Sequence, residues 1–117
     1  MGFKFEKLEV WQKAVDFSSK IHDLTRKFPK EELYVLTSQI KRAADSIVLN
    51  IAEGSTGQSN AEFKKFIGYA IRSAIEVVAC FYIGKKRGLI AEKEFRELYN
   101  EIEIIVKMLQ ALRNSLN

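Results

Sequence analysis

Five polar residues near the middle of this 117-residue chain have the spacing of a single helical stripe. Gln39, Arg42, Ser46, Asn50 and Glu53 follow one another at steps of three or four positions, which places them on one side of an α-helix. The set supplies an amide, a guanidinium, a hydroxyl and a carboxylate. These groups can bind a ligand or a neighbouring helix by charge and hydrogen bonding, and no nucleophile with an adjacent base is among them.

Partners for the stripe occur later in the chain. Arg72 and Glu76 are four positions apart, so they share a helical face. The stripe runs beside apolar positions, where polar groups are partly buried and need partners. We expect Arg42 to pair with Glu76, and Asn50 or Glu53 to meet Arg72 or a loop N–H. Two interpretations remain open: a network that fixes the register of helices or subunits, or a polar groove that binds a ligand.

The residues argue against catalysis and against a bound metal or cofactor. His22 is the single histidine and Cys80 the single cysteine, so the sequence predicts no metal-binding cluster and no cysteine–histidine nucleophile. The loop at Gly54 and Gly57 lacks the lysine of a phosphate-binding loop. We therefore expect a protein that is not an enzyme.

Apolar periodicity predicts the elements that position these residues. Residues recurring at three- and four-residue steps indicate four helices, and short connections favour antiparallel neighbours. The fold expected is all-α, an up-down-up-down antiparallel four-helix bundle forming one domain over residues 1–117. The predicted helices cover about 6–27, 30–53, 60–87 and 92–115.

Local signals place the ends of the second and third helices. Pro29 suits the first turn of the second helix, in which Leu33 is expected to face inward. Gly54 is expected to end that helix in a left-handed conformation. Ser59 and Glu62 form the capping-box pattern that begins the third helix.

The third helix is apolar on more than one side between residues 66 and 84. Its length would suffice for a membrane span, but Arg72 and Glu76 interrupt it and the other helices are amphipathic, so no membrane contact is expected. A helix with two apolar faces usually has two partners. We therefore expect a homo-oligomer, with Ile75 and Tyr82 on the face outside the bundle.

The charge balance permits contact with nucleic acid. A net charge of +4 is mildly basic, and repetition of each site in an oligomer would strengthen the field. The candidate phosphate contacts are Lys41, Lys64, Lys65, Arg72, Lys85, Lys86 and Arg87.

Two stretches carry a family resemblance that covers essentially the whole chain. FEKLEVWQKA and FPKEELYVLTSQIKRAADSIVLNIAEG, followed by Ser73 to Glu76 and RGLI, resemble the four-helix-bundle proteins encoded by intervening sequences of bacterial 23S rRNA genes. Val48 stands where that pattern usually has proline. The resemblance implies a homo-oligomer, a pentameric ring in known relatives. It also implies kinship with accessory proteins of diversity-generating retroelements, which associate with nucleic acid and a reverse transcriptase.

Two functions therefore remain open. The first is a non-catalytic oligomer that associates with nucleic acid, RNA rather than DNA, or with a nucleic-acid enzyme. The second is a protein-interaction scaffold without nucleic-acid contact. The lone Cys80 lies among apolar neighbours, as expected for a buried thiol, and is consistent with a cytoplasmic protein.

Overall fold

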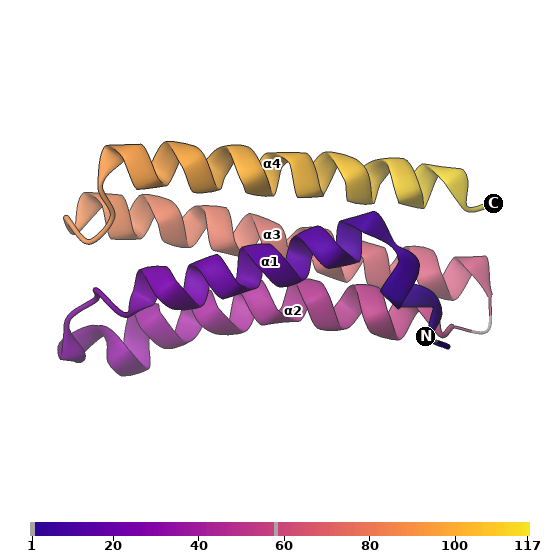
Figure 1. The fold of residues 1–117 in the computed structure, drawn as a ribbon, viewed down its shortest axis with the longest axis horizontal. Coiled ribbons are helices and arrows are strands. Elements are labelled where there is room, and N and C mark those ends of the chain that lie inside the picture. The colour runs from indigo at the N-terminus through magenta and orange to yellow at the C-terminus, as the bar shows by residue number, and fades with distance from the viewer. Residues whose placement is uncertain (1, 58) are drawn as a thin grey trace.

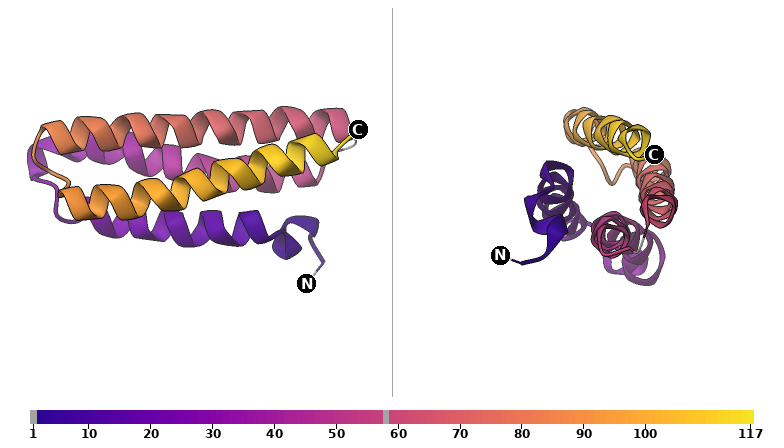
Figure 2. Two further views of the ribbon diagram at one scale, coloured as in Figure 1. Left: turned by 90° about the horizontal axis from the view of Figure 1, so that it is seen from above. Right: turned by 90° about the vertical axis from the view of Figure 1, so that its right-hand side faces the viewer.

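The computed structural model describes residues 2–57 and 59–117 and shows an all-helical bundle. Within these residues there are four α-helices and no strand: α1 (Glu9–Thr25), α2 (Ser38–Ser55), α3 (Asn60–Lys86) and α4 (Glu92–Ser115). Consecutive helices run in opposite directions and pack side by side (Figures 1 and 2). The predicted fold class is confirmed. Both termini lie at one end of the bundle, together with the α2–α3 connection (Figure 1).

One apolar core runs the length of the bundle. Phe17 and Phe81 are buried at its centre with ring centroids 6.4 Å apart, and Phe95 lies 6.3 Å beyond Phe81. All four helices contribute fully buried side chains, as the three- and four-residue periodicity predicted. The largest of the others are Ile21, Ile40, Ile47, Ile51, Ile67, Ile102, Ile105, Leu109 and Val77.

The α2–α3 contact is the tightest helix pair, and Gly54 makes it possible. Gly54 lies within α2 and is buried. Among the described glycines only Gly88 has positive φ, so Gly54 is not the left-handed stop that the sequence suggested. A Cβ at Gly54 would lie 2.6 Å from Cβ of Phe66 and 3.0 Å from Cδ1 of Phe63. The glycine is needed for close helix approach.

The contact between α1 and α4 depends more on charge. Lys20 and Glu101 form an ion pair of 2.6 Å across this seam, and Lys27 pairs with Glu94. The hydrogen bond and negative charge of Glu101 raise the pKa of Lys20. An open hollow of about 400 Å3 also lies along the seam. The first and last helices are therefore the most loosely joined neighbours.

The second predicted helix begins differently from the prediction. A 3-10 turn, η2 (Lys30–Glu32), leads into a π-helical turn, η3 (Leu33–Thr37), before α2 starts. Leu33 is the first residue of this wider turn, which directs its side chain differently from an α-helix, and it is 47% exposed instead of facing inward. The first helix also starts later than expected, after a 3-10 turn, η1 (Lys4–Lys7).

Candidate functional site

A small polar layer joins α2 to α3 midway along the bundle. The Ser73 hydroxyl lies 2.9 Å from the Ser46 hydroxyl. Asn50 Nδ2 donates to the Ser46 carbonyl at 2.8 Å and to the Ser46 hydroxyl at 2.9 Å. Nearer the end of the bundle where η3 lies, the Gln39 amide donates to the Glu76 carboxylate. Gln39 and Ser46 thus contact α3 directly, and Asn50 contacts Ser46 from within α2.

The charged members of the stripe behave differently from the prediction. Neither the Arg42–Glu76 pair nor a contact of Arg72 with Glu53 or Asn50 is among the interactions of the described residues. Glu76 instead accepts from Gln39, and Asn50 donates to Ser46. Arg42, Glu53, Arg72 and Glu76 are all exposed. Two cations and two carboxylates therefore remain on the outer surface of α2 and α3 with no ion pair inside the described chain.

Apolar side chains share this outer surface. Ile75 and Tyr82, expected to face outward, are 60% and 55% exposed. Tyr69 and Ile83 on α3 and Leu49 on α2 are exposed as well. We call this surface the α2–α3 face; it comprises the four charged residues above with Leu49, Tyr69, Ile75 and Ile83. Tyr82 lies to one side of it, against Phe95 of α4, with ring centroids 5.1 Å apart. The α2–α3 face combines apolar area with balanced charge, as protein interfaces often do.

Three of the seven candidate phosphate contacts are already paired. Lys65 lies 3.3 Å from Glu62, Lys85 2.6 Å from Glu92 and Arg87 2.9 Å from Glu32.

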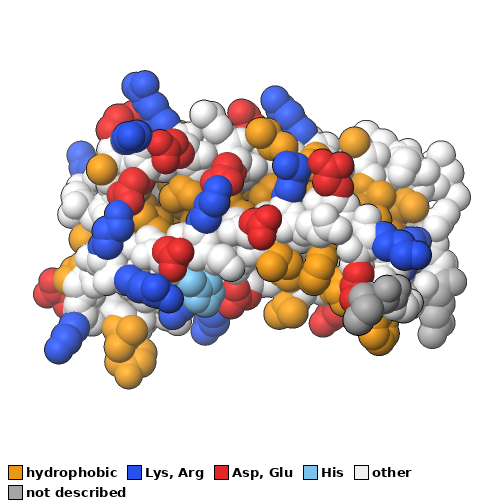
Figure 3. Space-filling model, viewed as in Figure 1, with side chains coloured by type: hydrophobic (Ala, Val, Ile, Leu, Met, Phe, Trp, Pro, Cys, Tyr) orange, Lys and Arg blue, Asp and Glu red, His pale blue; other side chains and the backbone are white. Residues whose placement is uncertain are grey.

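The other four, Lys41, Lys64, Arg72 and Lys86, make no ion pair within residues 2–57 and 59–117. On the face shown in Figure 3, cations and carboxylates alternate rather than form a single positive patch. A binding surface for phosphates would therefore depend on these four side chains.

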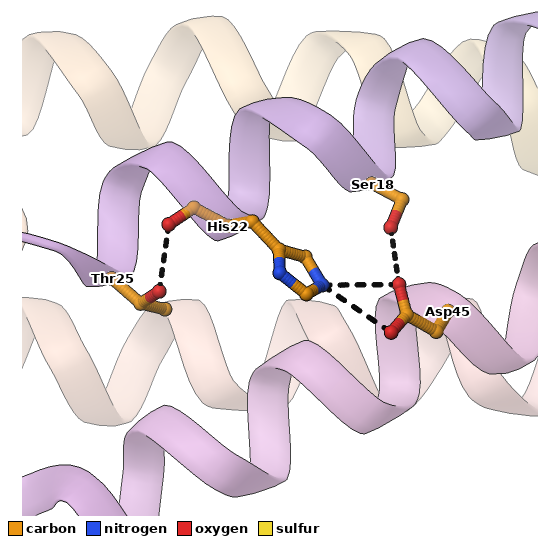
Figure 4. A network of polar contacts seen from close by, with 4 residues as sticks. All are labelled: Ser18, His22, Thr25 and Asp45. Carbon is orange, nitrogen blue, oxygen red and sulfur yellow. Dashed lines mark hydrogen bonds and ion pairs between the residues drawn. The ribbon is translucent and has the colours of Figure 1, made fainter.

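A second polar cluster, on the opposite flank of α2, was missed by sequence reasoning. Ser18 donates to Asp45 at 2.5 Å, and His22 Nε2 lies 3.1 Å from the same carboxylate oxygen (Figure 4). Thr25 donates to the His22 carbonyl at 2.8 Å. The signal available was the four-residue step from Ser18 to His22, which puts both on one face of α1. Their partner on α2 depends on the register of the two helices.

This cluster is not a catalytic triad despite its composition. In a triad the histidine lies between serine and carboxylate and accepts the serine proton. Here Asp45 lies between Ser18 and His22 and receives both contacts (Figure 4). Ser18 is 8% exposed and its hydroxyl donates to the carboxylate, so nothing in the cluster activates it as a nucleophile.

The described residues also bear on metal binding and membrane insertion. The described residues contain no group of three or more histidine, cysteine, aspartate or glutamate side chains able to hold a metal ion. One helix among them, Asn60–Lys86, is long and apolar enough to cross a membrane by length and composition. Core helices of bundles share that property, and nine residues of this helix are buried against the other helices.

Comparison with known families adds the identification. Residues 6–111 match the family described as 23S rRNA-intervening sequence protein. The chain belongs to this family. A crystal structure of an S23 ribosomal protein family member of unknown function from Bacteroides thetaiotaomicron is similar, with a TM-score of 0.84 and 25% identity over 90% of this chain and 95% of that one. No curated protein matches the chain. The solved S23 family structure thus has the same fold as this chain, and neither match comes with an activity.

Proposed function

We propose that this 23S rRNA-intervening sequence protein is a non-catalytic homo-oligomer, a pentamer by its family resemblance, that associates with RNA in the cytoplasm. The observation that carries the proposal is the α2–α3 face. Arg42 and Arg72 lie there with Glu53 and Glu76, and no ion pair within the described chain uses them. Equal numbers of cations and carboxylates, beside the exposed side chain of Ile75, suit contact with another copy of the chain.

Association with RNA is supported by the cations outside that face. Lys41, Lys64 and Lys86 make no ion pair within the described residues, and an assembly would present each of them several times. Repeated lysines bind phosphates with an affinity that falls steeply as salt rises. Arg72 belongs to the α2–α3 face and serves assembly in this proposal.

Two measurements test the proposal in sequence. Light scattering coupled to size exclusion gives the mass of the particle; Ile75→Glu is expected to release monomers that keep their helical circular dichroism, whereas Ile104→Glu on α4 leaves the assembly intact. Ile104 is a matched control because it is also exposed, at 52%. An assembly unchanged by Ile75→Glu would exclude this face.

Fluorescence anisotropy with a structured RNA then tests binding across a salt series. We expect binding at low salt that weakens as salt rises, and a shallower salt slope when Lys64 and Lys86 are changed to Gln. Changing Lys13 and Lys93 to Gln provides a charge-matched control.

A protein-interaction scaffold is the second candidate. It is favoured by the alternating charges in Figure 3 and by the three candidate cations already paired within the chain. Intact assembly with no RNA binding at low salt would support this alternative over the first.

A further inference from the structure

One half of the seam between α3 and α4 carries positive charge and no acidic side chain. Residues 63–75 of α3 and 104–117 of α4 contain neither aspartate nor glutamate. Their cations are Lys64, Lys65, Arg72, Lys107 and Arg113. The two stretches lie side by side at the end of the bundle that holds both termini (Figure 2), where Asn60 donates to the Asn117 carbonyl at 3.1 Å.

The other half of the same seam has its charges paired. Lys85 lies 2.6 Å from Glu92, and Arg96 lies 2.8 Å from the same side chain. At the border of the basic half, Glu62 already contacts Lys65 at 3.3 Å. Positive charge is therefore compensated along one half of the seam and accumulates along the other.

Gly68 leaves the surface of α3 open within this basic half. The atom nearest to a Cβ added at Gly68 is Arg113 Nη1, 3.9 Å away, so the guanidinium of α4 reaches the glycine. Lys64 lies one turn earlier on the same side of α3. Lys64 and Arg113 are both half-buried, and neither makes an ion pair within residues 2–57 and 59–117.

These two cations have the chemistry of a phosphate site. A guanidinium presents its N–H groups as a planar fork that matches two oxygens of a phosphate, and the lysine ammonium adds a point charge. Because Gly68 has no side chain, a phosphate can approach the helix between the two cations.

The single sign of the charge favours nucleic acid over a protein as the ligand. Protein interfaces mix apolar area with both signs of charge, as the α2–α3 face does. A surface with several cations and no carboxylate is typical of contact with a phosphate backbone. Exposed Lys107 on α4 extends this surface beyond Arg113.

We propose that Lys64 and Arg113 bind a backbone phosphate of RNA beside Gly68, and that this half of the α3–α4 seam is the RNA-binding surface. The inference rests on the RNA association proposed above and locates it. Arg113 brings a contact that the sequence did not suggest, because its place beside Gly68 depends on how α4 packs on α3. The site lies on the α4 side of α3, so assembly through the α2–α3 face presents it once in every copy.

Substitution of Arg113 tests the site. Arg113→Gln is expected to weaken binding of a fluorescent RNA hairpin by roughly 5-fold or more at low salt, and to make the salt slope shallower by about 1 for each copy in contact. Arg113→Lys keeps the charge, so it should keep the slope and lose less affinity. Fluorescence anisotropy gives both quantities, and light scattering with circular dichroism checks that each variant is folded and assembled.

Arg26→Gln is the charge-matched control. Arg26 follows α1 and is exposed, at the end of the bundle opposite to the termini (Figure 1). It removes the same charge from a place where no RNA contact is expected. Equal weakening by Arg26→Gln and Arg113→Gln would show that binding follows net charge alone, and would overturn the site.

Chemical protection tests the same site in the unaltered protein. Lysines are acetylated and arginines are modified with phenylglyoxal, with and without the RNA hairpin, and the modified peptides are quantified by mass spectrometry. We expect RNA to protect Lys64 and Arg113 and to leave Lys93 and Arg26, both exposed at the other end of the bundle, modified as before. Unchanged modification of Lys64 and Arg113 in the presence of bound RNA would contradict the proposal.

The outcomes separate this site from RNA association itself. RNA binding that Arg113→Gln leaves unchanged in affinity and salt slope would overturn the site and leave RNA association standing. A wild-type assembly that does not bind RNA at low salt would overturn both.

Discussion

The side-chain oxygens of Ser46 and Ser73 lie 2.9 Å apart and join the middle of α2 to the middle of α3. Ser46 also accepts from Asn50, so one hydroxyl oxygen is shared between a neighbour in its own helix and one across the interface. Both serines are half-buried, where an unpartnered polar group is costly. The pair therefore helps to set the register of the two helices.

The first prediction concerns this register. Ser73→Ala is expected to lower the free energy of unfolding by about 0.5–1.5 kcal/mol, and Ser46→Ala by more, because it also deprives Asn50 of an acceptor. The double variant should lose less than the sum of the two, since neither hydroxyl is then left alone. Urea unfolding of all four proteins measures this; strictly additive losses would mean that the two hydroxyls are not coupled.

Alanine substitutions at two glycines are expected to change the stability of the bundle in opposite directions. Gly54→Ala improves helix propensity by up to about 1 kcal/mol, but its methyl group would meet Phe66 Cβ at 2.6 Å, so we expect a net loss of about 1–3 kcal/mol. At Gly68 in α3 the nearest atom to an added Cβ, Arg113 Nη1, is 3.9 Å away. Gly68→Ala should therefore gain about 0.5–1 kcal/mol. Thermal unfolding distinguishes the two, and a stabilised Gly54→Ala would show that α2 and α3 can separate there.

Asp45 is predicted to stabilise the bundle without supporting catalysis. Asp45→Ala removes the acceptor of the buried Ser18 hydroxyl and should cost about 1–3 kcal/mol. His22→Ala should cost less, because Asp45 would still accept from the Ser18 hydroxyl and no buried polar group would lose its partner. A fluorophosphonate probe is expected to leave Ser18 unlabelled; labelling above that of a Ser18→Ala control would contradict the structural role assigned here.

The Glu92 carboxylate predicts how the stability of the bundle changes at acid pH. Hydrogen bonds from Lys85 and Arg96 lower the pKa of its carboxyl, and the Lys85 pair ties the end of α3 to the start of α4. A folded-state pKa below the unfolded one means that the stabilisation is present above about pH 4.3, the ordinary value for glutamate. It disappears as the pH falls through the lower folded value.

The melting temperature of Glu92→Gln should therefore fall below that of the wild type at neutral pH and converge with it in acid. Glu103→Gln, an exposed position on the same helix, is the control. A gap that persists in strong acid would assign the effect to something other than this charge.

Helical periodicity predicted the four-helix class and most of the core, because each stripe can be read within a single helix. The start of α3 was predictable for the same reason, because its capping signal lies within four neighbouring residues: the Ser59 hydroxyl accepts from the Glu62 N–H at 3.1 Å. The π turn was not predictable in this way. Leu33 and Leu36 have the spacing of an ordinary α-helical stripe, and the sequence alone does not show that the chain widens between them.

The sequence also could not show which of several possible partners a polar side chain contacts. Gln39 and Arg42 lie on the same side of α2, and both could have been assigned to Glu76; the relative positions of α2 and α3 decide for Gln39. The contact of His22 with Asp45 likewise depends on how α1 lies along α2. Periodicity within one helix carries no information on the axial offset of two helices.

The placement of the chain ends has a practical consequence. The N- and C-termini lie at one end of the bundle, and η3 lies at the other (Figure 1). A fluorescent protein or affinity tag fused to either terminus would therefore project away from η3. Labelling at either terminus would leave the exposed side chains of η3 unobstructed.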